Sequence, residues 1–99
     1  MNEKVFVVVE LVAQDGKFQE MKGILEELAQ ETRKETGVLE YFFIEDQTKP
    51  NTMLSIERWE NAQEETKHWE TPHLKKALEK VTKILVDNKA IVHKGLKII

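Results

Sequence analysis

The chain of 99 residues contains no cysteine, and its 15 basic and 18 acidic side chains give a net charge of −3. The absence of cysteine excludes disulfides, thiolate chemistry and iron–sulfur clusters. The nearly balanced charge does not indicate binding to nucleic acid or to a membrane surface. No segment approaches the roughly 18 consecutive apolar residues of a membrane span, and the N-terminus lacks a signal peptide, so we expect one cytoplasmic domain over residues 1–99.

The first half of the chain predicts a strand, a helix and a second strand. Val5–Val12 is β-branched and apolar, as in a strand, and the Gln-Asp-Gly sequence at residues 14–16 predicts a turn. Apolar residues at helical spacing predict a helix over residues 17–36, which we expect to end at Gly37 as its C-terminal cap. Residues 38–45 again have the composition of a strand.

The second half predicts a strand, a helical region and a last strand. A loop over residues 46–51 leads to a strand over residues 52–59, and two helical segments follow over residues 62–70 and 72–86. Residues 90–99 close the chain as a fourth strand. The β-α-β-β-α-β order is that of the ferredoxin-like α+β fold, in which an antiparallel sheet carries its helices on one face.

Two capping signals divide the helical region of the second half. Asn61 opens a capping-box-like sequence, and Thr71 before Pro72 is a favoured pair for the cap and first position of a helix. His68 precedes the second cap and His73 follows it. We therefore expect both histidines near the seam between the sheet and the helices.

The hydrophobic pattern of the strands predicts an apolar face that the helices do not cover. Two helices cover one face of a four-stranded sheet, so the other face should carry polar side chains. Residues 5–9 are instead apolar at every position, and the Tyr-Phe-Phe-Ile sequence at residues 41–44 places bulky groups on both faces. Such a patch usually marks an interface. We expect a homodimer packed sheet against sheet as a dimeric α+β barrel; the alternative is a monomer with an apolar face.

Four landmarks resemble the antibiotic biosynthesis monooxygenase family of dimeric α+β-barrel proteins. They are Glu10 six residues before Gly16, Gly-Val-Leu-x-Tyr at residues 37–41, Glu-Arg-Trp-Glu at residues 57–60, and His-x-x-Thr-Pro-His at residues 68–73. The resemblance covers nearly the whole chain. It implies the fold but no single chemistry, because the family includes cofactor-free oxygenases of quinols and polyketide aromatics, haem-degrading oxygenases, and an isomerase of phosphorylated autoinducer-2.

Individual positions set the haem-degrading branch aside. Val9, His68 and Leu78 stand where those relatives carry an Asn, a Trp and a His, and a leucine cannot ligate iron. The segment at residues 68–73 resembles both the quinol-oxidising members and the isomerase, and Gly-Leu at residues 95–96 resembles the isomerase. The resemblance therefore leaves oxygenase and isomerase chemistry open.

The resemblance implies a substrate pocket between the sheet and the helices, with His68 as the catalytic proton acceptor. Imidazole titrates near neutral pH, so it can take a proton from a phenol. The residues expected to line this pocket are Met21, Leu25, Tyr41, Phe43, Trp59 and His73. Trp59 also fits an ordinary core position, and His73, at the second position of its helix, also fits a structural role.

We expect a small-molecule oxygenase that oxidises a quinol-like or phenolic aromatic with O2. It needs no cofactor, because the deprotonated substrate supplies the electrons. One alternative is an isomerase of a phosphorylated small metabolite, for which Lys22, Arg33 and Arg58 are the available cations. A second is a non-catalytic dimer that binds a small ligand and requires no base.

The histidine spacing predicts no metal site. His68 and His73 are five residues apart and separated by Pro72, so they do not share one helical face, and no carboxylate is an evident third ligand. The isolated glycines form no phosphate-binding loop. We expect no nucleotide or flavin.

Three further side chains have predicted environments. We expect His68 to be half exposed and to contribute little to stability, and His93 to be a surface residue of the last strand. Glu57 lies on the same strand face as Trp59, where a buried carboxylate requires a partner. Since Arg58 points to the other face, that partner is expected to be a lysine or a backbone donor.

Overall fold

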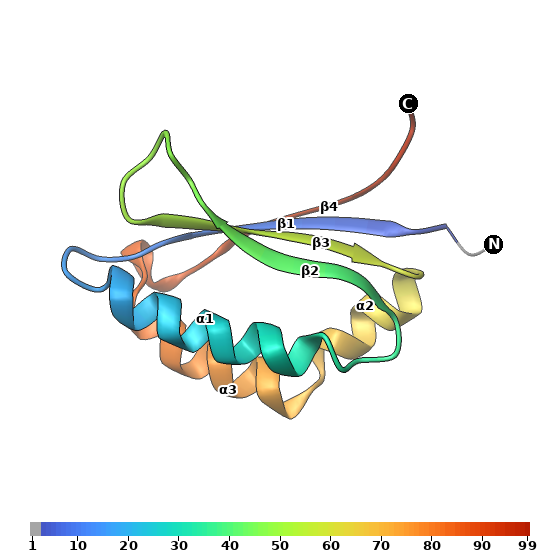
Figure 1. The fold of residues 1–99 in the computed structure, drawn as a ribbon, viewed down its shortest axis with the longest axis horizontal. Coiled ribbons are helices and arrows are strands. Elements are labelled where there is room, and N and C mark those ends of the chain that lie inside the picture. Colours follow the sequence, from blue (N-terminus) through green and yellow to red (C-terminus); the bar gives the residue numbers. More distant parts are fainter. Residues whose placement is uncertain (1–2) are drawn as a thin grey trace.

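A computed structural model describes residues 3–99 of the chain. The elements are β1 (Val5–Val12), α1 (Phe18–Thr32), β2 (Val38–Glu45), β3 (Thr52–Trp59), α2 (Ala62–Trp69), α3 (Pro72–Val81) and β4 (Ile91–Leu96). Short 3₁₀ turns at Thr82–Ile84 and Val86–Asn88 join α3 to β4. Figure 1 shows the helices on one side of a single sheet. The predicted ferredoxin-like α+β fold and the limits of the first three strands are confirmed.

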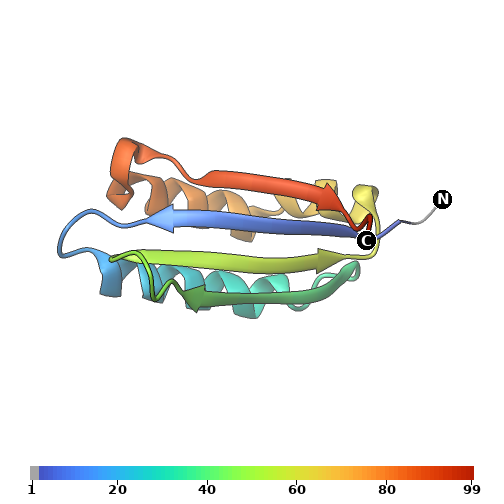
Figure 2. The same cartoon turned by 90° about the horizontal axis from the view of Figure 1, so that it is seen from above.

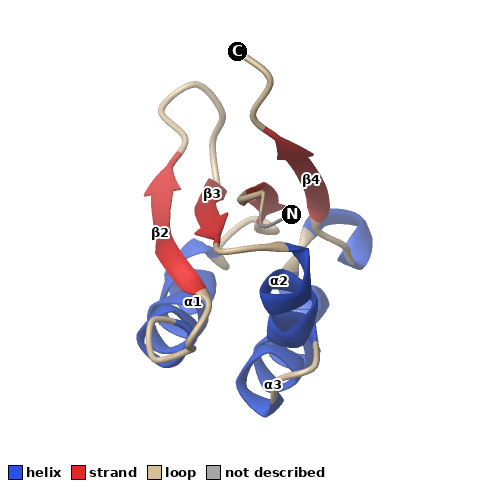
Figure 3. Ribbon diagram, turned by 90° about the vertical axis from the view of Figure 1, so that its right-hand side faces the viewer, coloured by secondary structure: helices blue, strands red, loops and turns tan. Residues whose placement is uncertain are grey.

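The sheet is antiparallel throughout, in the strand order β2-β3-β1-β4. β1 therefore occupies a central position between β3 and β4. In Figure 3, which views the molecule from one end, α1 lies on the β2 side, and α2 and α3 lie on the β4 side. β4 stops at Leu96, earlier than predicted, because Leu96 pairs with Val5, the first residue of β1, and residues 3–4 before it are not part of a strand.

The turn after α1 differs from the prediction. α1 ends at Thr32, and the chain turns through residues 33–37, where the N–H of Glu35 donates to the Thr32 carbonyl at 2.9 Å. Gly37 is not the helix cap. A Cβ at Gly37 would lie 2.2 Å from Cβ of Glu64 on α2, so this position requires glycine because the turn packs directly against α2.

We expect Gly37→Ala to destabilise the protein by about 1–3 kcal/mol, since the added methyl group must displace either the turn or α2. The measurement is urea unfolding followed by circular dichroism. Gly23→Ala on α1 is the matched control, because a Cβ there meets nothing within 4 Å. It should stabilise the helix by roughly 0.5–1 kcal/mol. Equal effects of the two substitutions would contradict the steric explanation.

α3 is also shorter than predicted and ends at Val81. Thr82 Oγ1 donates to the Leu78 carbonyl at 2.7 Å, and the chain tightens there into 3₁₀ turns. Extended backbone at Leu85 follows, so that its fully buried side chain enters the core and its backbone pairs with Ala13. A continued helix over these residues could not make that pairing.

The core fills the space between the sheet and the helices. One cluster, which includes Met21, Leu25, Val81 and Leu85, lies between α1, α3 and the sheet. A second cluster surrounds Trp59 and includes Val5, Val7, Ala29 and Tyr41. Within residues 3–99, no helix is both long and apolar enough to cross a bilayer.

The other side of the sheet, here called the outer face, carries no helix (Figure 2). The strand register places one row of apolar side chains across it, since Val8 pairs with Ile56 and Ile56 pairs with Phe42. The apolar side chains of the outer face include Phe6, Val8, Phe42, Ile44, Leu54, Ile56 and Ile91, of which four are exposed by 38–45%. The predicted apolar face is confirmed, and its role as a dimer interface stays a prediction.

Candidate functional site

A cavity of about 200 Å³ lies between the helix-facing side of the sheet and the helices. Its wall is mostly apolar, and Ser55, Glu57 and His68 add polar groups to it. Elements from both halves of the chain contribute, from β1 to β4 and from all three helices. The cavity therefore joins apolar packing surface to a small set of hydrogen-bonding and titratable groups, as ligand pockets do.

The structure places some of the predicted pocket residues in this wall and others outside it. Leu25, Tyr41, Phe43 and His68 line the cavity. The remaining three predicted residues are Met21, Trp59 and His73. Met21 and Trp59 are fully buried core residues that are not part of the wall, and His73 borders a separate groove between α1 and α3.

Glu57 is the buried acidic group of the cavity. Ser55 Oγ donates to its Oε2 at 2.7 Å, and Trp59 Nε1 donates to its Oε1 at 3.0 Å. Ser55 Oγ in turn accepts the Val9 backbone N–H at 3.0 Å. The prediction of a lysine or backbone partner is therefore wrong. The donors are the side chains of Ser55 and Trp59, which lie two residues before and two residues after Glu57 on the same face of β3. Arg58 instead pairs with Glu40 on the outer face.

Burial raises the pKa of the Glu57 carboxyl, while the Ser55 and Trp59 donors and the nearby His68 ring oppose the rise. Glu57 therefore holds its proton to higher pH than a free glutamate. Burial, followed by the charge of Glu57, also raises the pKa of the neighbouring Tyr41 phenol. Tyr41 consequently remains a neutral hydrogen-bonding group in the cavity wall at physiological pH.

His68 is buried rather than half exposed, with only 3% of its side chain accessible. Its ring stacks at a tilt on Trp59, with a centroid separation of 4.7 Å, and meets Tyr41 edge-on at 5.5 Å. Nδ1 lies 2.8 Å from Oε2 of Glu35. The expectation that His68 contributes little to stability is therefore not supported, because a buried ring with these contacts is part of the core.

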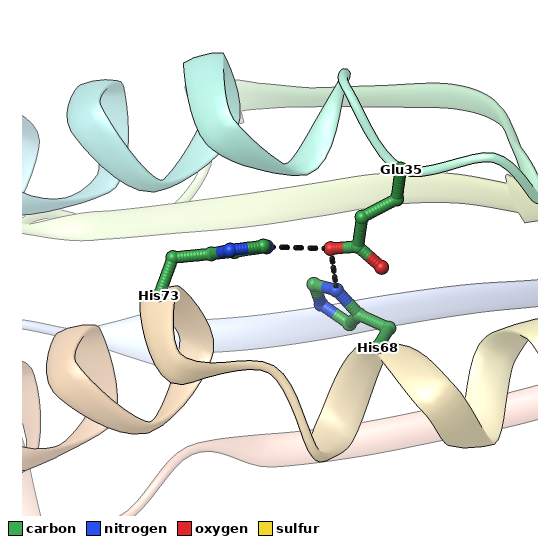
Figure 4. Close-up of side chains that lie close together, drawn as sticks. All are labelled: Glu35, His68 and His73. Carbon is green, nitrogen blue, oxygen red and sulfur yellow. Dashed lines mark hydrogen bonds and ion pairs between the residues drawn. The ribbon is translucent and has the colours of Figure 1, made fainter.

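The same Glu35 oxygen also meets His73, whose Nε2 lies 2.6 Å away (Figure 4). An ionised carboxylate can only accept hydrogen bonds, so both imidazoles donate to it. In the neutral ring of His68 the proton then lies on Nδ1, and the other nitrogen, Nε2, carries the lone pair. Among residues 3–99 no side chain hydrogen-bonds to Nε2 of His68, which leaves it available to a ligand.

His68 and His73 do not share one helical face, as predicted, but they lie together, and Glu35 is the carboxylate that the sequence did not show. Thr71 explains the difference: its Oγ1 donates to the His68 carbonyl at 2.8 Å and accepts the Leu74 N–H at 3.3 Å. It thereby ends α2 and begins α3 at one point. The resulting bend directs His68 and His73 to the same carboxylate, which two positions on one continuous helix at this spacing could not share.

Glu35 is the site residue that the sequence did not reveal. It lies in the turn that Gly37 holds against α2, 33 residues before His68. Because Glu35 falls inside the predicted helix 17–36, nothing in the sequence distinguishes it from the other polar residues of that helix. The one local signal is Gly37, two positions later, because a glycine can also mark a close contact between backbone segments.

A second polar network joins α2 to β4. Lys94 Nζ lies 3.0 Å from Oε2 of the buried Glu65, which also accepts the Trp69 indole N–H. Lys94 additionally lies over the Trp69 ring, 5.1 Å from its centroid. This network fixes Trp69 in the cavity wall. His93, the neighbour of Lys94, is exposed, as predicted for a surface strand residue.

Sequence and structure comparisons agree with this architecture. Residues 4–80 match the family described as Antibiotic biosynthesis monooxygenase. An uncharacterized protein of Synechocystis sp. is 26% identical over 84 residues, which make up 85% of this chain and 57% of that protein. The chain therefore spans little more than half the length of this relative.

Solved structures share the fold over nearly the whole chain. A conserved protein from Methanosarcina mazei Go1 superposes with a TM-score of 0.88 at 22% identity, covering 94% of this chain and 91% of that one. A structure described as an antibiotic biosynthesis monooxygenase gives a TM-score of 0.88 at 19% identity, covering 95% and 98%. At such identities the likeness shows the fold alone.

Proposed function

Because this chain belongs to the antibiotic biosynthesis monooxygenase family, we propose that it oxidises a small quinol-like or phenolic aromatic with O2 in the cavity between sheet and helices. The observation that supports this proposal most directly is His68: a buried imidazole in the cavity wall, with one nitrogen fixed by Glu35 and the other free. This is the arrangement of an oriented proton acceptor.

The proposed reaction begins when Nε2 of His68 takes a phenolic proton from the bound substrate. The resulting anion is electron-rich and reduces O2 directly. One oxygen atom enters the ring and the second leaves as water, so that a hydroquinone becomes a hydroxyquinone and supplies all four electrons. The proposal requires no cofactor, because the substrate is the reductant. The protein binds and orients the ring, removes the proton and excludes water.

The cavity also limits the substrate. Its volume of about 200 Å³ is below the roughly 300–1,000 Å³ common for ligand pockets, which favours one ring or two fused rings. Within residues 3–99, no lysine or arginine lines the cavity. A phosphorylated metabolite would leave its charge without a partner there, so the cavity favours a neutral aromatic over the isomerase substrate.

The test is oxygen consumption with reduced menadione and with hydroquinone, measured against autoxidation without protein. We expect protein-dependent uptake and, with ¹⁸O2, one labelled oxygen atom in the quinone product. Uptake equal to autoxidation for both substrates, together with isomerisation of a phosphorylated sugar-like ligand, would instead favour the alternative chemistry.

We also propose that the outer face binds a second copy of this chain. Its exposed apolar side chains belong to three different strands and form one surface, and burying such a surface stabilises association by about 25 cal/mol per Å². Sedimentation equilibrium at micromolar concentration should give twice the 11.6 kDa chain mass.

The expected dimer can be tested at Phe42, which is 39% exposed on the outer face. Phe42→Lys should shift the sedimenting species to the monomer, because a charge would be buried at the interface. Gln30→Lys adds the same charge to an exposed position on α1 and should leave the dimer intact. A wild-type monomer at high micromolar concentration would overturn the proposal.

A further inference from the structure

We propose that Glu35, His68 and His73 together bind a divalent transition-metal ion of the Zn²⁺ type, and that the bound ion switches His68 from proton acceptor to proton donor. The metal site stands on the geometry alone. Its effect on His68 rests on the proposed function.

Three ligand groups meet at this point from three separate elements. Glu35 comes from the turn after α1, His68 from the last turn of α2 and His73 from the first turn of α3. Each offers one ligand atom, and these atoms all lie within 4.8 Å of one another. Figure 4 shows the two rings directed at the carboxylate from different sides. Two imidazoles and one carboxylate are the donor set of open zinc and other transition-metal sites.

The hydrogen bonds occupy the positions that a metal ion would take. The Glu35 oxygen lies 2.8 Å from Nδ1 of His68 and 2.6 Å from Nε2 of His73. Metal–ligand bonds of about 2.0–2.1 Å in a tetrahedron place neighbouring donor atoms about 3.3 Å apart, so each of the two Glu–His pairs must separate by roughly 0.5–0.7 Å. Small side-chain rotations provide that space, and the ion then replaces the two shared protons.

The surroundings do not oppose a cation. Within residues 3–99, only the two histidines hydrogen-bond to the Glu35 side chain, so no lysine or arginine has to be displaced from it. The side chains of Glu35 and His73 are 14% and 24% exposed. The ion can therefore arrive from solvent, and water can fill its remaining coordination position, while His68 stays buried.

Coordination changes what His68 offers to the cavity. A metal ion bound through Nδ1 uses the lone pair of that nitrogen, so the ring proton must reside on Nε2. The nitrogen left free in the metal-free protein then becomes an N–H donor and can no longer accept a phenolic proton. Metal binding and base catalysis at His68 are thus mutually exclusive.

Binding is tested first, without any substrate. Metal-free protein is titrated with Zn²⁺ by calorimetry and with Co²⁺ by visible absorption, and we expect one tight equivalent and the d–d bands of nitrogen-ligated Co²⁺. His73→Ala and Glu35→Gln should each weaken Zn²⁺ binding by at least about 10–100-fold. Losing a residue that only hydrogen-bonds to a metal ligand already has an effect of this size, and losing the ligand itself should have no smaller one. His93→Ala removes an exposed histidine outside the cluster and should bind as wild type does.

Two results would overturn the site: no saturable Zn²⁺ binding by the wild type, or equal affinity in wild type and both cluster variants. Mg²⁺ should not compete, because it prefers oxygen ligands. Circular dichroism checks that each variant is folded. If His73→Ala does not fold, Glu35→Gln, which keeps the shape of the side chain, still tests the site.

Inhibition is tested separately. Zn²⁺ at a concentration that just saturates the wild type should remove the protein-dependent oxygen uptake of the wild type and of His93→Ala but not the residual uptake of His73→Ala, whose site stays largely empty at that concentration. Uptake that continues with Zn²⁺ bound would overturn the switch. Zn²⁺ binding without oxygen uptake from either substrate in the metal-free protein would contradict the proposed function and leave the metal site standing.

Discussion

Replacing His68 by alanine is expected to lower turnover of the best quinol substrate by about 10²–10⁴-fold, the usual contribution of a positioned acid or base. The ring is in the cavity wall, and its Nδ1 hydrogen-bonds to Glu35. Without the imidazole, the substrate must lose its phenolic proton to water. Steady-state oxygen uptake of the wild type and the variant at saturating substrate measures the effect.

The same substitution should also cost stability, by about 1–3 kcal/mol, because it removes a partner from Glu35 and a ring from between Trp59 and Tyr41. Glu35→Gln is the informative companion. It retains the shape of the side chain but not its charge, so it should lower kcat more than it changes KM. Full turnover by His68→Ala would show that the base lies elsewhere or that the protein only binds its ligand.

Trp59→Ala is expected to be the most destabilising single change, costing about 3–5 kcal/mol. Its side chain is fully buried at the centre of the second core cluster. It also donates one of the two hydrogen bonds to the buried Glu57. Truncation therefore leaves a cavity and also removes a hydrogen-bond donor from a buried carboxyl group. Urea unfolding followed by circular dichroism measures the loss.

Trp59→Phe separates the two contributions. It retains most of the ring volume but removes the indole N–H, so its cost should be about 1–3 kcal/mol, the penalty for a lost hydrogen bond in the interior. A cost below about 1 kcal/mol for Trp59→Ala would show that the core around this residue collapses without penalty, against the packing described here.

The fold was predictable because its signals are local. A β-branched run marks β1, and short segments rich in apolar residues mark β2 and β3 at their observed limits. Asn61 and Thr71 cap α2 and α3 as their sequences indicate. The errors occur where tertiary contacts override local preference. α1 ends early because the following turn must reach α2 at Gly37, and α3 ends early because Leu85 enters the core in extended backbone.

The candidate site was only partly predictable, for the same reason. His68 is recognisable from its position beside a helix cap, but its partner Glu35 lies 33 residues away, and no periodicity links the two. Met21 and Leu25 share a helix face, yet only Leu25 reaches the cavity wall. Which apolar residue borders a cavity depends on how far the layers separate at that point, and this distance is not encoded in a hydrophobic pattern.

The central position of β1 has a consequence for biosynthesis. β1 is synthesised before the other strands of this sheet and pairs on one side with β4, and the register joins Val5 to Leu96. That side of β1 therefore stays open until β4 has been synthesised, although the strand itself is apolar. Contacts of such long sequence separation slow folding, and an unpaired apolar strand can join a neighbouring nascent chain. Completion of β4 is thus the step that ends this exposure.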